Sequence, residues 1–174
     1  MRHSLIPIIL LFMVAVEGVA MELLPSSIKF ADIYIIPHWI LMFLVIVTTY
    51  AYQNQAMIPI VYAGIFGLMI DIVYTGILGV YMFVVPLALY IAQLLNRSFQ
   101  ANVWMVLIIT SISLFVLEVT LLIIYSFLGI STMDFSDFIS YRFFPTLLAN
   151  LVFILVIYYP SRKILTWIDM KKFT

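Results

Sequence analysis

The sequence predicts an all-α integral membrane protein with six transmembrane helices, and three observations support this fold class. Hydrophobic residues make up 66% of the 174 residues. Charged residues make up only 9%, whereas about 25% is usual for a soluble domain. The apolar residues form runs close to the length of about 20 residues that one bilayer crossing requires, and short polar segments separate them. We therefore treat residues 1–174 as a single transmembrane domain.

The first half of the chain is expected to cross the membrane three times, and polar residues mark the ends of the spans. The first run covers about Leu5–Leu24 and precedes Pro25-Ser26-Ser27. We interpret it as a retained transmembrane helix rather than a signal peptide, because further apolar segments follow. The second span covers about Ile33–Tyr52 and ends at Gln53-Asn54-Gln55, and the third covers about Met57–Tyr74.

The third and fourth spans lie in one nearly uncharged stretch, residues 56–95, which at roughly 40 residues is twice the length needed for one crossing. The chain must therefore reverse inside it, and Gly76 and Gly79 mark the reversal. The remaining expected spans are about Val80–Leu95, Val103–Leu128 and Phe138–Pro160, followed by a basic tail at 161–174.

Lysine and arginine residues predict the orientation, because they are enriched in cytoplasmic loops. With six spans, both termini lie on one side of the membrane. That side would hold Arg2, Arg97, Arg162, Lys163, Lys171 and Lys172, and the other side Lys29 and Arg142. The asymmetry predicts that both termini are cytoplasmic.

The composition excludes several classes of function. The formal net charge is zero and no basic stretch with interleaved aromatic residues is present, so no nucleic-acid partner is expected. The absence of cysteine excludes disulfides and cysteine-ligated metals. No nucleophile-elbow, zinc-protease or phosphate-loop motif occurs. We expect neither catalytic residues, nor a cofactor, nor a metal. The protein is expected to be in contact with membrane lipid.

The helical hairpin around residues 63–81 carries a stripe of small residues. Ala63, Gly67 and Asp71 repeat every four residues, so they share one face of a helix, where small side chains let a second helix approach closely in lipid. This predicts a helix-packing or partner interface, whose members are Ala63, Gly64, Gly67, Asp71, Gly76, Leu78, Gly79 and Tyr81.

Ionisable residues inside the spans form a second candidate site. Counted at 1.5 Å per residue from the cytoplasmic ends of their spans, Asp71, Glu118 and Glu17 lie about 21, 22 and 18 Å along. The outer ends of two further spans hold His38 and Arg142, so all five side chains are expected to form a buried polar cluster in the outer half of the bilayer.

Each member of this cluster has alternative roles. Arg142 either neutralises Asp71 or Glu118 or reaches the lipid headgroups from a helix end. His38 is interpreted as a neutral interfacial histidine, and Glu17 either joins the cluster or reaches water. Asp71 and Glu118 lie in long apolar runs, where an acid is costly, so each fixes helix positions or binds a transported ion or ligand.

Three motifs, spread over the whole chain, resemble those of the rod shape-determining MreD family. The first is Ala63, Gly67, Asp71, Leu78 and Gly79, continued by Val80-Tyr81-Met82-Phe83, with Ala63 where glycine is usual. The second is Pro37-His38-Trp39-Ile40-Leu41 at the start of the second span, and the third is Arg142-Phe143-Phe144-Pro145-Thr146 with Asn150 in the last span. Glu118 falls where the fifth span of the family carries an acidic residue.

The resemblance implies a non-enzymatic scaffold subunit of the bacterial cell-elongation complex in the inner membrane. Such proteins bind MreC and help couple MreB filaments to peptidoglycan synthesis and rod shape. The wider set of implied partners is a RodA-type glycosyltransferase, a class B penicillin-binding protein and RodZ. The implied fold is similar to the substrate-binding components of energy-coupling-factor vitamin transporters.

That similarity supplies the alternative function, a membrane substrate-binding component of a small-molecule transporter. Such a component is expected to present a closed outer cavity lined by tryptophan and polar groups, for which Trp39 is the candidate tryptophan. A scaffold is expected to present a groove or an exposed helix face instead.

Overall fold

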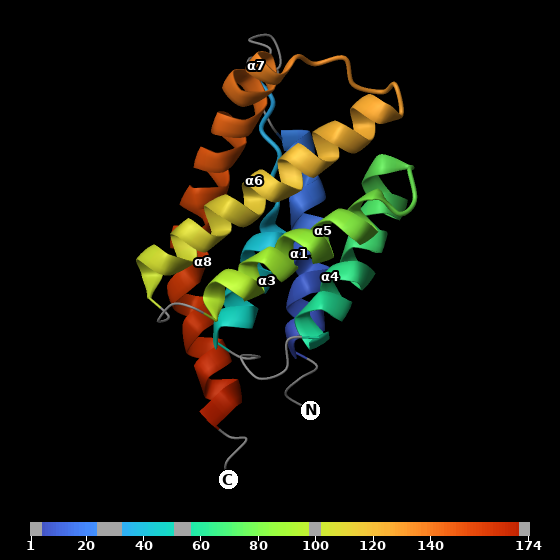
Figure 1. Ribbon diagram of the computed structural model, residues 1–174. Coiled ribbons are helices and arrows are strands. Elements are labelled where there is room, and N and C mark those ends of the chain that lie inside the picture. The colour runs from blue at the N-terminus through green and yellow to red at the C-terminus, as the bar shows by residue number, and fades with distance from the viewer. Residues whose placement is uncertain (1–4, 24–32, 51–56, 98–101, 171–174) are drawn as a thin grey trace.

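The computed structural model describes residues 5–23, 33–50, 57–97 and 102–170 (Figure 1). The predicted loops at 25–32, 53–55 and 98–101 lie outside the described residues, as do residues 24 and 51–52 at the predicted span ends. The same holds for Arg2, Lys29, Lys171 and Lys172, which entered the charge comparison. Within the described ranges, every regular element is helical.

The helices follow the predicted order closely. The described residues form six helices of 12 residues or more, namely α1 (Leu5–Leu23), α3 (Trp39–Tyr50), α4 (Met57–Ile70), α5 (Val80–Asn96), α6 (Val103–Phe127) and α8 (Phe144–Met170). Shorter elements extend two of them: η1 (Asp71–Thr75) follows α4, and α7 (Phe135–Asp137) with η2 (Phe138–Phe143) precedes α8. Figure 1 shows that α1 begins and α8 ends at the same end of the bundle.

In the part of the chain that the structure describes, three helical stretches are long and apolar enough to cross a membrane, namely Met57–Thr75, Val103–Phe127 and Phe135–Thr166. The other three apolar helices, Leu5–Met21, Trp39–Tyr50 and Val80–Asn96, are shorter. Together with the apolar composition, these helices identify the chain as an all-helical membrane protein.

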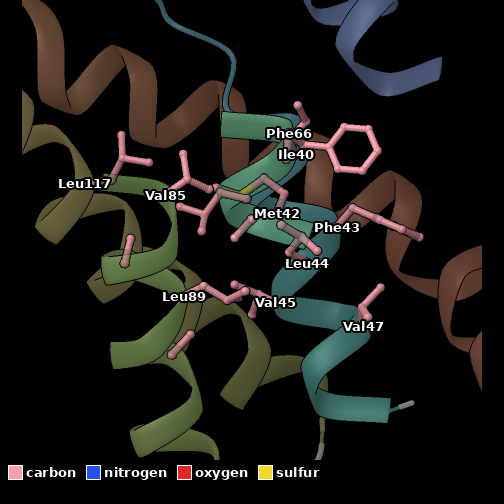
Figure 2. Close-up of a cluster of buried hydrophobic side chains, with 14 of the residues drawn as sticks. Ile40, Met42, Phe43, Leu44, Val45, Val47, Phe66, Val85, Leu89 and Leu117 are labelled. Atoms are coloured by element: carbon pink, nitrogen blue, oxygen red, sulfur yellow. The ribbon is translucent and has the colours of Figure 1, made fainter. Parts of the chain in front are cut away.

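Helix α3 occupies the centre of the bundle. It contacts α1, α4, α5, α6 and α8, and every residue from Ile40 to Thr49 is buried. Figure 2 shows Met42, Leu44 and Val45 of α3 packed among side chains of the neighbouring helices, including Phe66, Val85, Leu89 and Leu117. A helix that is apolar all round lies either in a protein core or in a membrane span, and α3 is enclosed by its neighbouring helices.

The second span differs from its prediction, because its first six residues, 33–38, are not helical. Residues 33–38 are extended, and helix α3 begins at Trp39. Pro37 explains the break: proline has no backbone N–H to donate, and it disfavours helical geometry at Ile36 before it. An extended segment at this depth needs other partners for its backbone groups.

The sixth span also differs, since its helix does not end at Pro160. Pro160 lies inside α8, which continues to Met170 through part of the predicted basic tail. Proline is tolerated inside membrane helices where neighbouring groups satisfy the freed backbone carbonyl.

Candidate functional site

Asp71 binds the start of the following helix. Its side chain is fully buried at the junction of α4 and η1. Its Oδ2 accepts hydrogen bonds from the backbone N–H groups of Gly79 and Met82 at 2.9 and 3.1 Å, and its Oδ1 accepts one from Tyr81 at 2.9 Å. A helix leaves its first N–H groups unsatisfied and carries partial positive charge there, so a carboxylate is the favoured cap.

The turn between Asp71 and α5 depends on its two glycines. Gly76 and Gly79 have φ values of 68° and 98°, in the left-handed region that residues with a Cβ rarely adopt. The Gly76 N–H also donates to the Asp71 carbonyl at 2.9 Å. Leu78, between the glycines, is exposed and takes no part in these contacts.

Gly67 lies at the closest approach of α4 to α5. A Cβ atom at this position would lie 2.5 Å from the Tyr81 carbonyl oxygen, which is too short for any contact. At neighbouring Gly64 the nearest atom to such a Cβ would be Pro86 Cγ, at an ordinary 3.8 Å. Ala63, one turn before Gly67, is fully buried. The stripe of small residues therefore packs against α5 inside the chain.

Glu118 is the centre of a second polar site, and its partners come from two other segments. Its Oε1 is 2.7 Å from His38 Nε2, and its Oε2 accepts a hydrogen bond from Arg142 Nε at 2.8 Å. Glu118 is fully buried and His38 nearly so, whereas the Arg142 side chain is 18% exposed. The guanidinium balances the buried carboxylate, and the histidine occupies its other oxygen.

The extended segment before α3 is held by polar side chains of α8. The Asn150 side-chain amide bonds to the backbone of this segment in the way that a neighbouring strand bonds in a sheet. Its Oδ1 accepts a hydrogen bond from the His38 N–H at 2.8 Å, and its Nδ2 donates one to the Ile36 carbonyl at 2.9 Å. The Thr146 hydroxyl accepts from the Ile36 N–H at 3.1 Å and donates to the Tyr34 carbonyl at 3.2 Å. These bonds replace the helical ladder that Pro37 prevents, and they fix where the His38 ring lies.

Glu17 of α1 contacts the beginning of α3. Its Oε2 accepts a hydrogen bond from the Ile40 N–H at 3.3 Å, and the side chain is buried. Glu17 is thus directed at the N-terminal end of α3, as Asp71 is directed at that of α5. It does not reach water.

The five residues of the predicted polar cluster thus divide into separate contacts. Glu118, His38 and Arg142 come together, whereas the hydrogen bonds of Asp71 and Glu17 go to helix starts. Tyr81 connects the two arrangements, since its N–H binds Asp71 and its ring lies 6.3 Å from the His38 ring.

Sequence reasoning gave Thr146 and Asn150 no site role, although both hold the extended segment. The available signal was a pair of polar residues four apart in an apolar run, which places both on one helix face.

The backbone geometry is unusual at two other residues of these sites, since Asp71 opens the π-helical turn η1 and Arg142 lies in the π-helical turn η2. Such turns often occur at functional sites.

A pocket opens beside Arg142, near the end of the bundle where α6 ends and α7 begins. Its volume is about 850 Å³. The described residues that line it are Tyr34, Tyr125, Ile130, Ser131, Thr132, Met133, Asp137, Tyr141 and Arg142. Trp39 is elsewhere: its ring stacks on Phe153 with centroids 4.4 Å apart, and it lines an apolar groove between α1 and α8.

The buried acids of this site are bonded within the chain. No group of three or more histidine, aspartate or glutamate side chains that could hold a metal occurs in the part of the chain that the structure describes. The three buried acids all have hydrogen-bond donors from this chain as partners. They are suited to fixing helices against one another.

Comparison with known proteins gives two matches. The family model for rod shape-determining protein MreD matches residues 2–168. The rod shape-determining protein MreD of Bacillus subtilis (strain 168) is 28% identical to this chain over 172 residues, which cover 99% of this chain and 97% of that protein. No solved structure matches the chain.

Proposed function

Since the chain belongs to the MreD family of rod shape-determining proteins, we propose that it is a non-enzymatic scaffold subunit of the bacterial cell-elongation complex. In this role it binds MreC in the inner membrane and helps couple MreB filaments to peptidoglycan synthesis. The observation that carries the proposal is the family match over residues 2–168, which is nearly the whole of this chain.

The proposal includes six spans, cytoplasmic termini and a fold similar to the substrate-binding components of energy-coupling-factor transporters. The six long helices support it, together with the common end at which α1 begins and α8 ends (Figure 1). In the cysteine-free chain, single cysteines are expected to react with an impermeant reagent from outside in Ser27→Cys and Ser136→Cys, and not in Gln55→Cys or Ser98→Cys. Labelling of Ser98→Cys without labelling of Ser27→Cys would reverse the orientation.

The buried carboxylates form hydrogen bonds within the chain, and this supports a scaffold function. A transporter component needs polar groups that face its solute, but the carboxylates of Asp71, Glu118 and Glu17 are already bonded to partners of the same chain. Apolar residues remain exposed along α8, including Leu148, Val152 and Val156. Such faces meet lipid or the apolar helices of other membrane proteins.

One observation favours the transporter alternative, namely the pocket of about 850 Å³ beside Arg142. Its described lining contains tyrosines but not Trp39, which was the tryptophan expected there. The described lining therefore has polar groups, as the alternative predicted, but not the expected tryptophan.

Co-purification from native membranes tests the two functions. The tagged full-length chain is expected to recover MreC and proteins of wall elongation. A test variant is Gly67→Leu, whose side chain would collide with the Tyr81 backbone and should reduce that recovery. Recovery of an ATPase transporter module in place of wall-elongation proteins would overturn the scaffold proposal.

A further inference from the structure

The pocket beside Arg142 contains hydrogen-bond donors that have no partner among the residues that the structure describes. Arg142 Nε is occupied by Glu118, yet a guanidinium carries five N–H donors. Among the described residues, the two terminal nitrogens of Arg142 have no hydrogen-bond partner, and the side chain lines the pocket. The edge formed by these two nitrogens matches two oxygens of a phosphate group, because guanidinium–phosphate contacts are frequently bidentate.

The same pocket also carries a negative charge that a simple anion site would not favour. Asp137 lines it one turn before Arg142 and is exposed. Because Glu118 already pairs with Arg142, Asp137 adds a further acidic group to the lining of the pocket. A ligand bearing both a phosphate and an ammonium group fits this arrangement better than one bearing phosphate alone.

Aromatic rings supply a second reason to expect a cation. Tyr34, Tyr125 and Tyr141 all line the pocket. Tyrosine rings attract ammonium groups at their faces, and their hydroxyls bind the polar oxygens of an interface. Ser131 and Thr132 add further hydroxyl groups.

The surroundings of the pocket indicate that its ligand is attached to the membrane. Phe127 is 90% exposed, and Phe135 on the other side of the loop is 61% exposed. Ile130 lies between them in sequence, is 58% exposed and lines the pocket itself. Large apolar residues at such exposure are stable in contact with lipid, so the rim of the pocket lies where headgroups meet acyl chains.

We propose that this pocket binds the headgroup of a zwitterionic aminophospholipid. The phosphate lies against the terminal nitrogens of Arg142, the ammonium group lies near Asp137 and the tyrosine rings, and the acyl chains leave over the apolar rim. A volume of about 850 Å³ is in the range of small-molecule sites. The inference does not rest on the scaffold function, because it concerns the lining of this pocket alone.

The test measures binding of two short-chain lipids to the purified full-length protein in detergent by native mass spectrometry. Phosphatidylethanolamine and phosphatidylglycerol with identical acyl chains differ only in the headgroup. The ethanolamine lipid is expected to bind about threefold more tightly, because its ammonium group would form one exposed ion pair with Asp137, and such pairs contribute little. Equal affinity of the two lipids for the wild-type protein would overturn the proposal.

Substitutions locate the effect. Asp137→Asn is expected to remove the preference, whereas Asp134→Asn, an exposed neighbour outside the pocket lining, should keep it. Arg142→Lys retains the charge beside Glu118 but loses the planar pair of donors, so both lipids should weaken in parallel. If Asp137→Asn keeps the preference, or Asp134→Asn loses it, the assignment of the pocket is wrong.

Competition distinguishes a lipid from a soluble ligand. Phosphoethanolamine, which has the same headgroup chemistry without acyl chains, is expected to compete only weakly. Competition as strong as that of the lipid would show a site for a free solute and overturn the lipid assignment. Equal competition by inorganic phosphate would show a simple anion site and overturn the zwitterion assignment.

Discussion

Asp71 and Glu118 are both fully buried acids, but their partners differ in kind and in distance along the chain. Asp71 accepts hydrogen bonds from backbone N–H groups that lie 8, 10 and 11 residues later. Glu118 is paired with charged or chargeable side chains 80 and 24 residues away. The Asp71 contact can form when one helical hairpin forms, whereas the Glu118 contact requires three separate segments to assemble.

The difference also determines what the loss of a partner does. Without Asp71, the N–H groups at the start of α5 lose a neutral-to-charged hydrogen bond. Without Arg142, the buried carboxylate of Glu118 loses the cation that balances it, which costs more than a missing hydrogen bond. Four substitution experiments sharpen this comparison.

The largest effect is expected from Arg142→Met. It leaves Glu118 buried without a permanent cation and should cost about 3–5 kcal/mol of folding free energy. The measurement is the free energy of unfolding in detergent. Adding Glu118→Gln should restore part of the loss, whereas adding Asp71→Asn should restore none. Rescue by Asp71→Asn, or no rescue by Glu118→Gln, would contradict the assigned pairing.

A somewhat smaller loss, about 3 kcal/mol, is expected from Asp71→Ala, because an unsatisfied buried donor costs about 1–3 kcal/mol and the Gly79 and Met82 bonds are only partly buried. Three N–H groups lose their acceptor, of which that of Tyr81 is the most buried. Asp71→Asn keeps one acceptor oxygen and should lose less in the same unfolding measurement. Equal losses for the two variants would show that the negative charge, and not the hydrogen bonding, is what matters.

Gly67→Ala tests the close approach of α4 to α5, with Gly64→Ala as its matched control. The added methyl group would lie 2.5 Å from the Tyr81 carbonyl oxygen, so the helices must move apart. Overpacking of this kind costs about 1–3 kcal/mol. At Gly64 the nearest atom lies 3.8 Å away, and the thermal unfolding midpoint should barely change. Similar shifts for both variants would place the contact elsewhere.

The smallest effect, about 1 kcal/mol, is expected from Thr146→Val, which keeps the shape but removes one hydroxyl. That hydroxyl bonds to the Ile36 N–H and the Tyr34 carbonyl of the extended segment. The control is Thr120→Val, since the Thr120 hydroxyl bonds only within its own helix. Hydrogen exchange at Ile36 should rise in the first variant and not in the second. Unchanged exchange would mean that Asn150 alone holds the segment.

Much of the fold class and of the hairpin could be predicted, because both depend on local patterns. The composition and the apolar runs predict an all-helical membrane protein, and helical periodicity puts Ala63, Gly67 and Asp71 on one face. The glycines at 76 and 79 mark the turn because only residues without a Cβ adopt its positive φ values freely. These properties concern residues within one hairpin.

The tertiary structure decided which distant groups pair. The depth of a residue along its helix can be predicted from the sequence, so Asp71 and Glu118 were equal candidates for the acid that pairs with Arg142. The rotation of each helix about its axis is set by packing against its neighbours, and this rotation decides which acid faces Arg142. The extended segment at 33–38 likewise depends on contacts with distant parts of the chain. Pro37 indicates a break, but the segment is stable in the membrane only because Asn150 and Thr146, more than 100 residues later, satisfy its backbone groups. No local pattern contains the position of those partners. The sequence by itself therefore determined the all-helical membrane class and the hairpin, while the assembled bundle determined the polar contacts.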